Sequence, residues 1–541
     1  MNQARPSKPL VCDDDHAIPV SRWQLLTIAL VVVAFAFGVR WPFANESFWV
    51  DELHSAWSVW GSFGEVAQRA GHGNQTPVYY WALWVWRQFF GDSEWGLRAS
   101  SVLLSSLACG VVAAGVAHQT RVLAAGAIAG MLLAIDPHSL FFGTELRVFP
   151  AIMLISAITC WAWSLHQQSA SSRWAIVLLS LVTLAALIQP TSIGVLGWAA
   201  IGPIVTLCRC DGFASQDTRW RWLWIAVPTF ITLIVCWQLA GEVLVAAWKH
   251  RDQWASFASA RNWNQVETLW RWKTLAMLPA GLAIVAVLIE RFRDRNVGGS
   301  KSPRLNRIGQ WAWPIAWVVV ATAFFWTLSS TGIATVFHRR YMIASLPILA
   351  WGGGAAVAHF LATIGNWIET RRVNRHSPFA ISVGLVAVVI IIHVVQQQRQ
   401  PSRRILRGEG WRGAVRSVQA DENAEAKTVL LSPGLIEAER FLASGDTAKV
   451  RYLAFPLAGP YRVESVEVVQ LNDSPGDIAA MITRGEVESA ILRTSAASAN
   501  RWAQRIVASA GGKTRLSFRH LRFGSIAVIQ FDRIPVANTS Q

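Results

Sequence analysis

Residues 23–41 read WQLLTIALVVVAFAFGVRW, and this stretch decides the fold class. Its only charged side chain is Arg40. An apolar helix of about 20 residues is long enough to cross the roughly 30 Å hydrocarbon layer of a bilayer. The stretch is longer than the apolar core of a signal peptide, and no small-residue cleavage pattern follows it. We therefore expect an uncleaved transmembrane helix near the N-terminus.

The composition extends this expectation to most of the chain. Of 541 residues, 53% are hydrophobic and 15% are charged, whereas an ordinary soluble domain has about 25% charged residues. A purely soluble protein is therefore excluded. Residues 77–90 are too few and too aromatic for a comfortable span, and they predict an interfacial or re-entrant helix. Further apolar runs bring the expected number of spans to about eleven, and they lie at 98–117, 122–140, 148–165, 174–189, 192–208, 222–240, 272–290, 311–329, 342–362 and 379–396.

The positive charges follow the alternation of these spans. The net charge is +16, which in a soluble chain would suggest a nucleic-acid partner. Here the Lys and Arg residues gather in the N-terminal segment and in every second loop, for example at Arg121, Arg173 and the cluster 291–307. Because cytoplasmic loops carry this excess, we expect a cytoplasmic N-terminus and no nucleic-acid partner. The loops 42–97, 136–147, 241–271 and 330–341, and the tail from about 397, are then extracytoplasmic.

The expected fold class is an α-helical polytopic membrane protein with a C-terminal extracytoplasmic α/β domain. Residues 1–22 form a cytoplasmic N-terminal segment, and residues 23–396 form the multispanning domain, with 42–97 as its first outer loop. Residues 397–541 form the α/β domain, because their apolar runs shorten to strand length. These runs are 428–431, 489–492 and 525–531, and 496–510 has helical spacing.

The first outer loop contains the sharpest chemical feature, FWVDELH at residues 48–54. The adjacent carboxylates of Asp51 and Glu52 repel each other and are costly to desolvate, so they are either solvated or used. They could act as a general base on an acceptor, or hold a divalent cation with His54 or His72. A plain acidic pair favoured by a helix N-terminus is an equal alternative. A divalent metal and a metal-free mechanism both remain open, and no other cofactor is predicted.

The rest of the same loop combines polar groups with aromatic ones. His72 is followed by a Pro-started segment with Tyr79 and Tyr80, and the loop ends at Arg98. Such a sequence suits a site that holds a polar group at the membrane surface. An aromatic belt at the interface is the alternative, and it is the better interpretation of Trp84 and Trp86.

Two other outer loops carry charges that need partners. Glu145 and Arg147 border apolar helices, where charges are costly unless they are paired or face water. Arg339 and Arg340 lie on the non-cytoplasmic side, against the usual bias, and a guanidinium matches a phosphate group well. We expect one of these two arginines, Arg340, to enter a site. The alternatives are an interhelical ion pair for the first two residues and snorkelling to the headgroups for the second two.

Taken together, these elements resemble the polytopic GT-C glycosyltransferases that use a polyprenyl-phosphate sugar, such as the protein O-mannosyltransferases and the lipid A aminoarabinose transferases. Some positions depart from the family pattern: Gln75-Thr76-Pro77 replaces His-Pro-Pro, and Thr144, Leu146 and Phe149 replace Gln, Ala and Tyr around the Glu-x-Arg element. The matching elements are Asp51-Glu52, Pro77-Val78-Tyr79-Tyr80, Phe90 to Arg98, Glu145-x-Arg147, Arg340-Tyr341 and Trp411-Arg412-Gly413.

The resemblance implies a plasma (inner) membrane enzyme that moves a hexosyl or pentosyl unit from a polyprenyl-phosphate carrier to an extracytoplasmic acceptor. Membrane lipids are further expected partners. By position, the resemblance implies that Asp51 is the general base or the residue that orients the acceptor, and that Glu52 assists it. It also implies that Arg147 and Arg340 face the lipid phosphate. The residues expected to line the pocket are Glu145, His54, His72, Tyr79, Tyr80 and Arg98.

Three alternatives fit the sequence less well than this transferase. A transporter or lipid flippase would carry charged groups deep along its path, but the predicted spans are nearly free of acids at mid-depth. A receptor that uses the membrane part only as an anchor would not need about eleven spans. A ligase that uses a diphosphate-linked donor fits less well with the early acidic pair.

Overall fold

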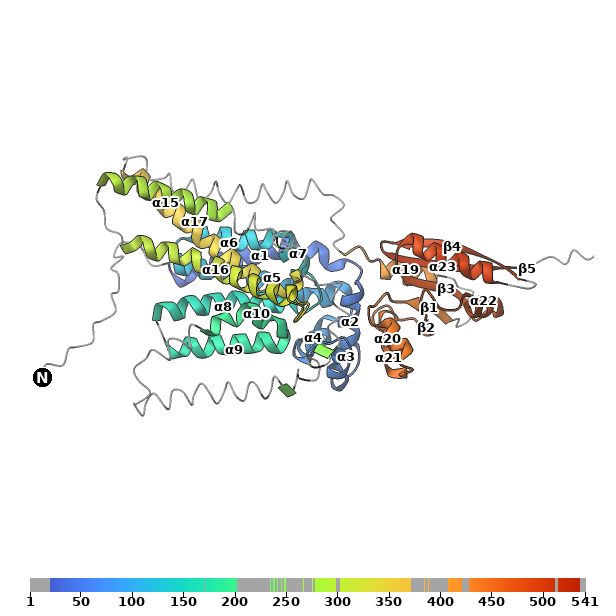
Figure 1. The fold of residues 1–541 in the computed structure, drawn as a ribbon. Helices are drawn as coiled ribbons and strands as arrows, with labels where there is room; N and C mark the ends of the chain where they lie inside the picture. Colours follow the sequence, from blue (N-terminus) through green and yellow to red (C-terminus); the bar gives the residue numbers. More distant parts are fainter. Residues whose placement is uncertain are drawn as a thin grey trace, which may run out of the picture.

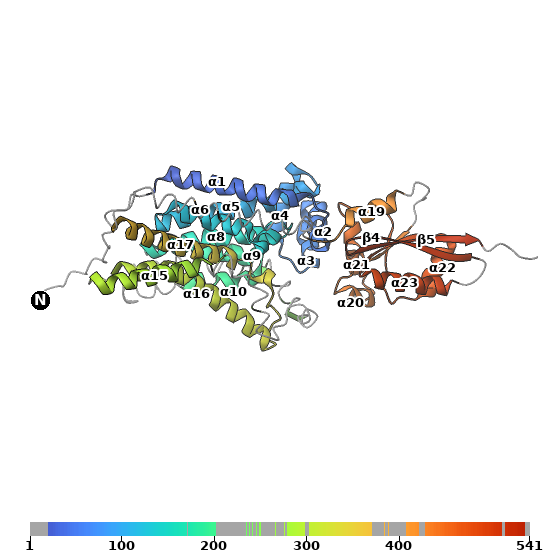
Figure 2. The same ribbon diagram turned by 90° about the horizontal axis from the view of Figure 1, so that it is seen from above.

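The computed structural model describes residues 20–169, 171–201, 278–297, 302–370, 407–420, 428–510 and 514–535, with single positions between 234 and 275 and at 384 and 388. A bundle of helices and a sheet-containing C-terminal domain are its two parts. The helices of the bundle run side by side, and the C-terminal domain lies beyond one end of them (Figures 1 and 2). The predicted fold class, a polytopic helical protein with a C-terminal α/β domain, is confirmed.

Five described helices are long and apolar enough to cross a membrane. A helix satisfies its own backbone polar groups, and the sequences of these helices carry few charges. Each of them is therefore suited to an apolar environment. Ser21 caps the first helix, and Ser93 caps the second. These helices lie at predicted spans, and they are α1 (Arg22–Arg40), α5 (Glu94–Thr120), α8 (Phe149–Ser169), α16 (Ser302–Ser330) and α17 (Ser345–Thr370).

The predicted span 122–140 is a bent pair of helices rather than one continuous helix. α6 (Leu123–Ile135) and α7 (Pro137–Gly143) meet at an angle of 66°. Asp136 causes the break, because its side chain accepts hydrogen bonds from the backbone N–H groups of His138 and Ser139 and so starts a new helix. Pro137 stands at the first position of that helix, where its missing N–H costs nothing. The bend brings the loop after α7 to the end of the bundle.

The other predicted spans are described in part. α9 (Ser172–Ile188) covers 174–189 but is a shorter apolar helix, and α15 (Leu278–Val297) covers most of 272–290. Of 192–208, the structure describes η3 (Pro190–Ser192), α10 (Ile193–Leu196) and the residues up to 201. Apart from a few single positions, the spans 222–240 and 379–396 lie outside the described residues, as does the segment 1–19. The total of about eleven spans therefore stays a prediction.

Small residues let the bundle pack closely around α5. This helix packs against α1, α6 and α8. A Cβ at Gly110 would lie 3.0 Å from the carbonyl oxygen of Ala29 in α1, and a Cβ at Gly126 would lie 2.3 Å from that of Ala113. Such close backbone approach is the usual way in which helices associate inside a membrane. It gives the bundle a rigid core beneath the loops at its end.

The segment 42–97 covers the end of the bundle that faces the C-terminal domain. The predicted short helix at 77–90 is α4 (Pro77–Phe90), which is too short to count as a span. It packs against α2, α3, α5 and α9. The other elements of the segment are η1 (Trp41–Asn45), α2 (Val50–Trp60), η2 (Phe63–Glu65) and α3 (Val66–His72).

The C-terminal domain contains a five-stranded sheet in the order β2-β1-β3-β5-β4. β1 (Thr428–Ser432) runs parallel to β2 (Val466–Val468) and to β3 (Val487–Arg493). β5 (Ile526–Pro535) is antiparallel to β3 and to β4 (Thr514–Phe523). The described helices of the C-terminal domain are α19 (Trp411–Gln419), α20 (Ala438–Ala443), α21 (Thr447–Leu453), η8 (Phe455–Leu457), α22 (Pro475–Arg484) and α23 (Ala496–Ser509).

Candidate active site at the junction of the bundle and the C-terminal domain

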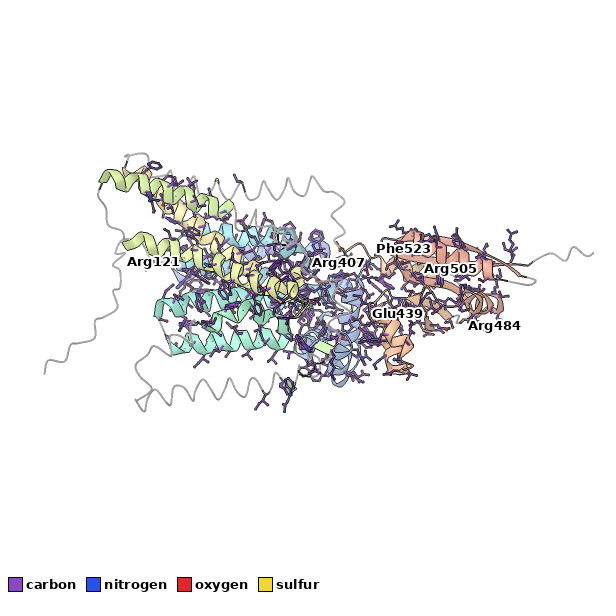
Figure 3. The ribbon with its side chains drawn as sticks, in the orientation of Figure 1. Arg121, Arg407, Glu439, Arg484, Arg505 and Phe523 are labelled. Carbon is purple, nitrogen blue, oxygen red and sulfur yellow. The ribbon has the colours of Figure 1, made fainter. Side chains whose placement is uncertain are left out.

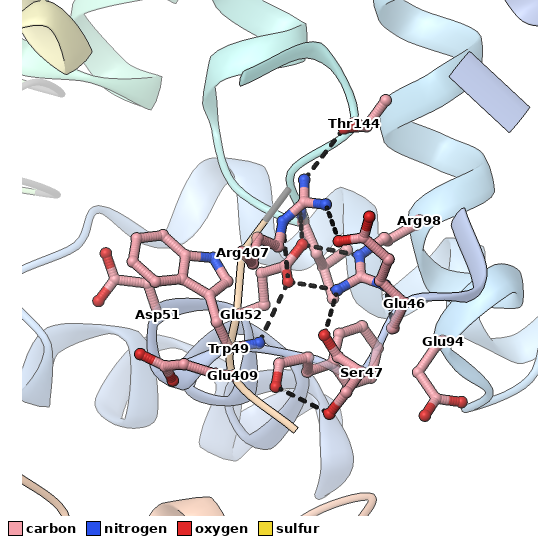
Figure 4. A network of polar contacts seen from close by, with 12 residues as sticks. Glu46, Ser47, Trp49, Asp51, Glu52, Glu94, Arg98, Thr144, Arg407 and Glu409 are labelled. Atoms are coloured by element: carbon pink, nitrogen blue, oxygen red, sulfur yellow. Dashed lines mark hydrogen bonds and ion pairs between the residues drawn. The ribbon is translucent and has the colours of Figure 1, made fainter. Parts of the chain in front are cut away.

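The acidic pair lies in the first turn of α2. Asp51 and Glu52 follow Val50, the first residue of the helix, and acidic side chains are favoured there by the helix dipole. Consecutive helical residues point about 100° apart, so the two carboxylates enter different surroundings. Figure 4 shows the Glu52 carboxylate inside a network of polar contacts and the Asp51 carboxylate outside it.

Glu52 is fully buried and is bound by two arginines. Arg98 Nε donates to Glu52 Oε1 at 2.8 Å, and its Nη2 donates to the other oxygen. The backbone N–H of Leu146 also donates to Oε1 at 2.8 Å, and Arg407 Nε lies 3.4 Å from Oε2. Burial raises the pKa of Glu52, but the charges of Arg407 and Arg98 outweigh it, so the pKa lies below its usual value. Glu52 therefore ties three segments of the chain together as a carboxylate.

Arg98 holds the loop that leads into α2. It is fully buried at the start of α5, with its guanidinium 4.8 Å from the ring centre of Phe48. It donates to the backbone carbonyls of Ala44, Glu46 and Ser47 as well as to Glu52. All its donors are thus used by the protein itself. Arg98 was predicted to line the pocket, and in the structure it holds Glu52 and the loop before α2 in place.

Asp51 has a different environment, which is half-buried and rich in positive charge. Its Oδ2 lies 3.9 Å from Arg340 Nη1, and Arg147 Nη1 donates to its backbone carbonyl at 3.1 Å. Burial alone would raise the pKa of Asp51, but Arg147, Arg340 and Arg493 together lower it below its usual value. Asp51 is therefore ionised at neutral pH and faces three guanidinium groups.

Glu145 and Arg147 lie in the loop between α7 and α8, not on a helix. Both are buried, and neither Glu145 Oε2 nor Arg147 Nε has a hydrogen-bond partner among the described residues. Burial raises the pKa of Glu145 to about 8, so this carboxyl group is mostly protonated at neutral pH. Burial disfavours the charge of Arg147, but Asp51 and other acidic groups raise its pKa above the usual value. The loop thus places a mostly neutral carboxyl group, Glu145, and a positively charged guanidinium group, Arg147, beside Asp51.

Arg340 enters the site from a short 3-10 helix, η6 (Arg339–Met342). Its backbone N–H donates to Nδ1 of His338 at 3.2 Å, and Gln189 Nε2 donates to its carbonyl at 3.4 Å. Burial and the charge of Arg340 lower the pKa of His338 to about 3, so His338 accepts this bond as a neutral imidazole. The local turn therefore directs Arg340 toward Asp51.

The predicted aromatic residues form the wall beside Asp51. Tyr79 and Tyr80 are buried and pack edge to face, with ring centres 5.2 Å apart. Burial raises the pKa of both hydroxyl groups above the usual value, so they stay protonated. His54 lies next to Tyr80, and burial and Arg147 lower its pKa to about 3. His54 is therefore neutral, and this wall carries no net charge.

The C-terminal domain adds residues that the sequence did not single out. Tyr452 and Phe455 pack edge to face on His54, and the ring of His72 stacks on Tyr452 with centres 5.5 Å apart. Arg493, at the end of β3, binds Glu409 at 2.7 Å and contributes its charge to the field at Asp51. The only family-like element that the sequence analysis named in this domain is Trp411-Arg412-Gly413, and it makes none of these contacts.

A metal site was left open by the sequence. Among the residues that the structure describes, no group of three or more His, Cys, Asp or Glu side chains is placed to hold a metal ion. Both oxygens of Glu52 are occupied by donors from Arg98 and Leu146, and its environment is that of an ion pair.

Comparisons with known proteins agree with the resemblance predicted from the sequence. Residues 74–237 match the family model described as dolichyl-phosphate-mannose-protein mannosyltransferase. The matched range contains the Tyr pair, Arg98 and the loop with Glu145 and Arg147. The predicted family resemblance is confirmed. No curated protein matches the chain.

Two solved structures are similar in fold to this chain. One is ArnT from Cupriavidus metallidurans bound to undecaprenyl phosphate, with a TM-score of 0.49, 11% identity, and 94% of this chain and 98% of that chain covered. The other is ArnT from the same organism in the apo state, with a TM-score of 0.48, 13% identity, and coverage of 94% and 97%.

Proposed function

We propose that this protein is an integral-membrane glycosyltransferase that moves a sugar from a polyprenyl-phosphate carrier to an extracytoplasmic acceptor with inversion. The observation that carries the proposal is the meeting of Asp51, Arg147 and Arg340 at one end of an apolar bundle. The family match over residues 74–237 and the undecaprenyl phosphate bound by ArnT support a lipid-linked donor. The sugar is a hexosyl or pentosyl unit, and the acceptor is a lipid, a glycan or a protein.

In the proposed reaction Asp51 acts as the general base. Its lowered pKa keeps it ionised at neutral pH, so it can accept the proton of an acceptor hydroxyl or amine. The acceptor oxygen or nitrogen then forms a bond to the anomeric carbon as the bond from that carbon to the phosphate oxygen breaks. Attack from the face opposite the leaving group inverts the configuration. The products are the glycosylated acceptor and the free polyprenyl phosphate.

Arg147 and Arg340 bind the donor phosphate in this proposal. Negative charge grows on the phosphate as it leaves, and fixed guanidinium groups stabilise that charge more in the transition state than in the ground state. Arg147 Nε has no hydrogen-bond partner among the described residues, so it retains a donor for this role. Glu145, as a neutral acid, can donate a hydrogen bond to a sugar hydroxyl or to the phosphate.

We assign Glu52 a positioning role rather than a direct one. The sequence predicted that Glu52 assists Asp51, but its carboxylate is saturated by Arg98 and the Leu146 amide. Its function in the proposal is to hold the Asp51 turn against the loop that carries Arg147.

The proposed orientation follows from the positions of the charges. Arg121 lies at the end of the bundle away from Arg407, which lies at the junction with the C-terminal domain (Figure 3). With Arg121 on the cytoplasmic side, the site and the C-terminal domain are extracytoplasmic, in the plasma (inner) membrane. A lipid donor keeps its tail in the bilayer while its phosphate reaches the site. The charges at the bundle end favour this chemistry over a transporter or flippase.

The test is mass spectrometry of glycans and lipids from a strain that lacks the gene. We expect one sugar to disappear from one acceptor and to return with the wild-type gene. It should also return with the control Asp477→Asn, an exposed position in the first turn of α22. It should not return with Asp51→Asn. Full recovery with an Asp51→Asn protein that is present in the membrane would contradict the assigned base.

A further inference from the structure

The start of the C-terminal domain reaches back to the turn that carries Asp51. Glu409 is buried, and its Oε2 accepts hydrogen bonds from the backbone N–H of Val50 at 2.9 Å and from Trp411 Nε1 at 2.8 Å. Its other oxygen accepts a bond from Arg493 Nε at 2.7 Å. One carboxylate from the C-terminal domain thus holds the residue immediately before Asp51.

The bond to Val50 satisfies a group that the helix itself cannot satisfy. The first N–H groups of an α-helix have no partner within the helix, and Val50 is the first residue of α2. In most helices a nearby side chain or water serves such a group. Here the acceptor lies 359 positions further along the chain. The C-terminal domain thus contacts the first turn of α2 directly beside Asp51.

Arg407 makes a second connection next to the first. Its side chain is buried, Nη1 donates to Glu46 Oε2 at 3.2 Å, and Nη2 donates to Thr144 Oγ1 at 3.0 Å. Its Nε lies 3.4 Å from Glu52 Oε2. Arg407 therefore contacts both the loop before Asp51 and the loop that precedes Arg147, as Figure 4 shows.

We propose that Arg407 and Glu409 are positioning residues, through which the C-terminal domain fixes the base Asp51 relative to the phosphate-binding loop. The expected effect of these residues on transfer rests on the proposed function. The ordering of the Asp51 turn by the C-terminal domain is independent of that function. The C-terminal domain then contributes to sugar transfer, although neither Arg407 nor Glu409 touches the substrate.

The experiment uses the full-length protein with Glu409→Gln and Arg407→Gln, each compared with the wild type. The control is Arg484→Gln, which removes an exposed arginine at the far end of the same domain (Figure 3). Hydrogen exchange of purified protein in detergent reports on residues 46–54 and, separately, on strands β1 and β3. Mass spectrometry of the complemented deletion strain reports on transfer.

We expect exchange at residues 46–54 to become on the order of 10-fold faster in both variants, while β1 and β3 keep their protection. Transfer should fall about 10- to 100-fold, because small displacements of a reacting group are costly. The control should change neither measurement. Unchanged exchange at 46–54, or equal loss of protection in β1 and β3, would overturn the inference. A wild-type protein that transfers no sugar would overturn the proposed function, and the exchange measurement would still decide the positioning role.

Discussion

Arg340 Nη1 lies 3.9 Å from Asp51 Oδ2, so the proposed phosphate ligand and the proposed base face each other directly. The charge of Arg340 stabilises the ionised form of Asp51 and helps to lower its pKa. A donor phosphate that binds Arg340 would take part of that interaction away from Asp51. The carboxylate would then become a stronger base at the moment when the donor is in place. In the proposed mechanism, this pair would link donor binding to activation of the acceptor.

Replacing Arg340 tests this relationship. Arg340 is one of the charges that lower the pKa of Asp51. In Arg340→Gln the pKa of Asp51 rises, so the acidic limb of the transfer rate, which requires ionised Asp51, moves to higher pH. We also expect transfer to fall about 100-fold, since a charge-assisted contact to the phosphate is lost. The measurement is the rate of transfer in membranes from pH 8 down to below pH 3.8, the ordinary pKa of Asp51, because the wild-type limb lies below that value.

The neighbouring arginine provides the control for this variant. Arg339 lies in the same 3-10 helix, but it is not among the main charges that lower the pKa of Asp51. Arg339→Gln should keep both the rate and the acidic limb. An acidic limb that stays in place in Arg340→Gln would show that Arg340 does not act on Asp51.

Glu145 makes the stability of the protein depend on pH. Its ordinary pKa is 4.5, and burial raises the value to about 8 in the folded protein. A raised pKa contributes stability that is present below pH 4.5 and is lost as the pH rises through about 8. The loss is on the order of several kcal/mol. Because glutamine mimics the protonated acid, Glu145→Gln should lose less stability over this range.

The measurement for Glu145 is thermal unfolding in detergent at pH 5, 7 and 9. Wild type and Glu145→Gln should unfold at similar temperatures at pH 5, and the variant should be the more stable at pH 9. Parallel curves for the two proteins over the whole range would show that Glu145 does not titrate there.

His54 should not contribute to the pH dependence of transfer above pH 5. Burial and the charge of Arg147 lower its pKa to about 3, so it is neutral throughout that range. His54→Phe keeps an aromatic ring among Tyr80, Tyr452 and Phe455. We expect the limbs of the pH–rate profile to stay within about 0.3 pH units of the wild type. A limb between pH 5 and 8 that disappears in this variant would contradict the neutral assignment.

Several parts of the fold could be predicted because they rest on local properties of the sequence. Apolar length predicted α1, α5 and α8, and a helix too short to span was expected at α4. The break at Asp136 was missed, although Asp-Pro is a strong signal for the start of a helix. An apolar run does not show whether its helix is bent.

The candidate site was predictable only where a charge stood out against its surroundings. Asp51, Arg147 and Arg340 meet such a criterion, because charges at the ends of apolar spans need a reason. The sequence could not separate Glu52 from Asp51, since the difference lies in Arg98 and Arg407, which are 46 and 355 positions away by residue number. It also could not find Glu409. Its role depends on how a distant domain docks, and a single sequence holds no record of that contact.

The ion pair between Glu52 and Arg98 should control folding rather than the chemical step. Both side chains are fully buried, and the carboxylate is the centre of the network around the Asp51 turn. Removing one partner leaves an unpaired buried charge, which costs about 3–5 kcal/mol. We therefore expect Glu52→Gln to lower the amount of folded protein and its unfolding temperature. The surface pair of Arg484 and Glu486 provides the control, and Arg484→Gln should change neither quantity. If Glu52→Gln folds like the wild type but transfers no sugar, Glu52 acts in catalysis, as the sequence first predicted.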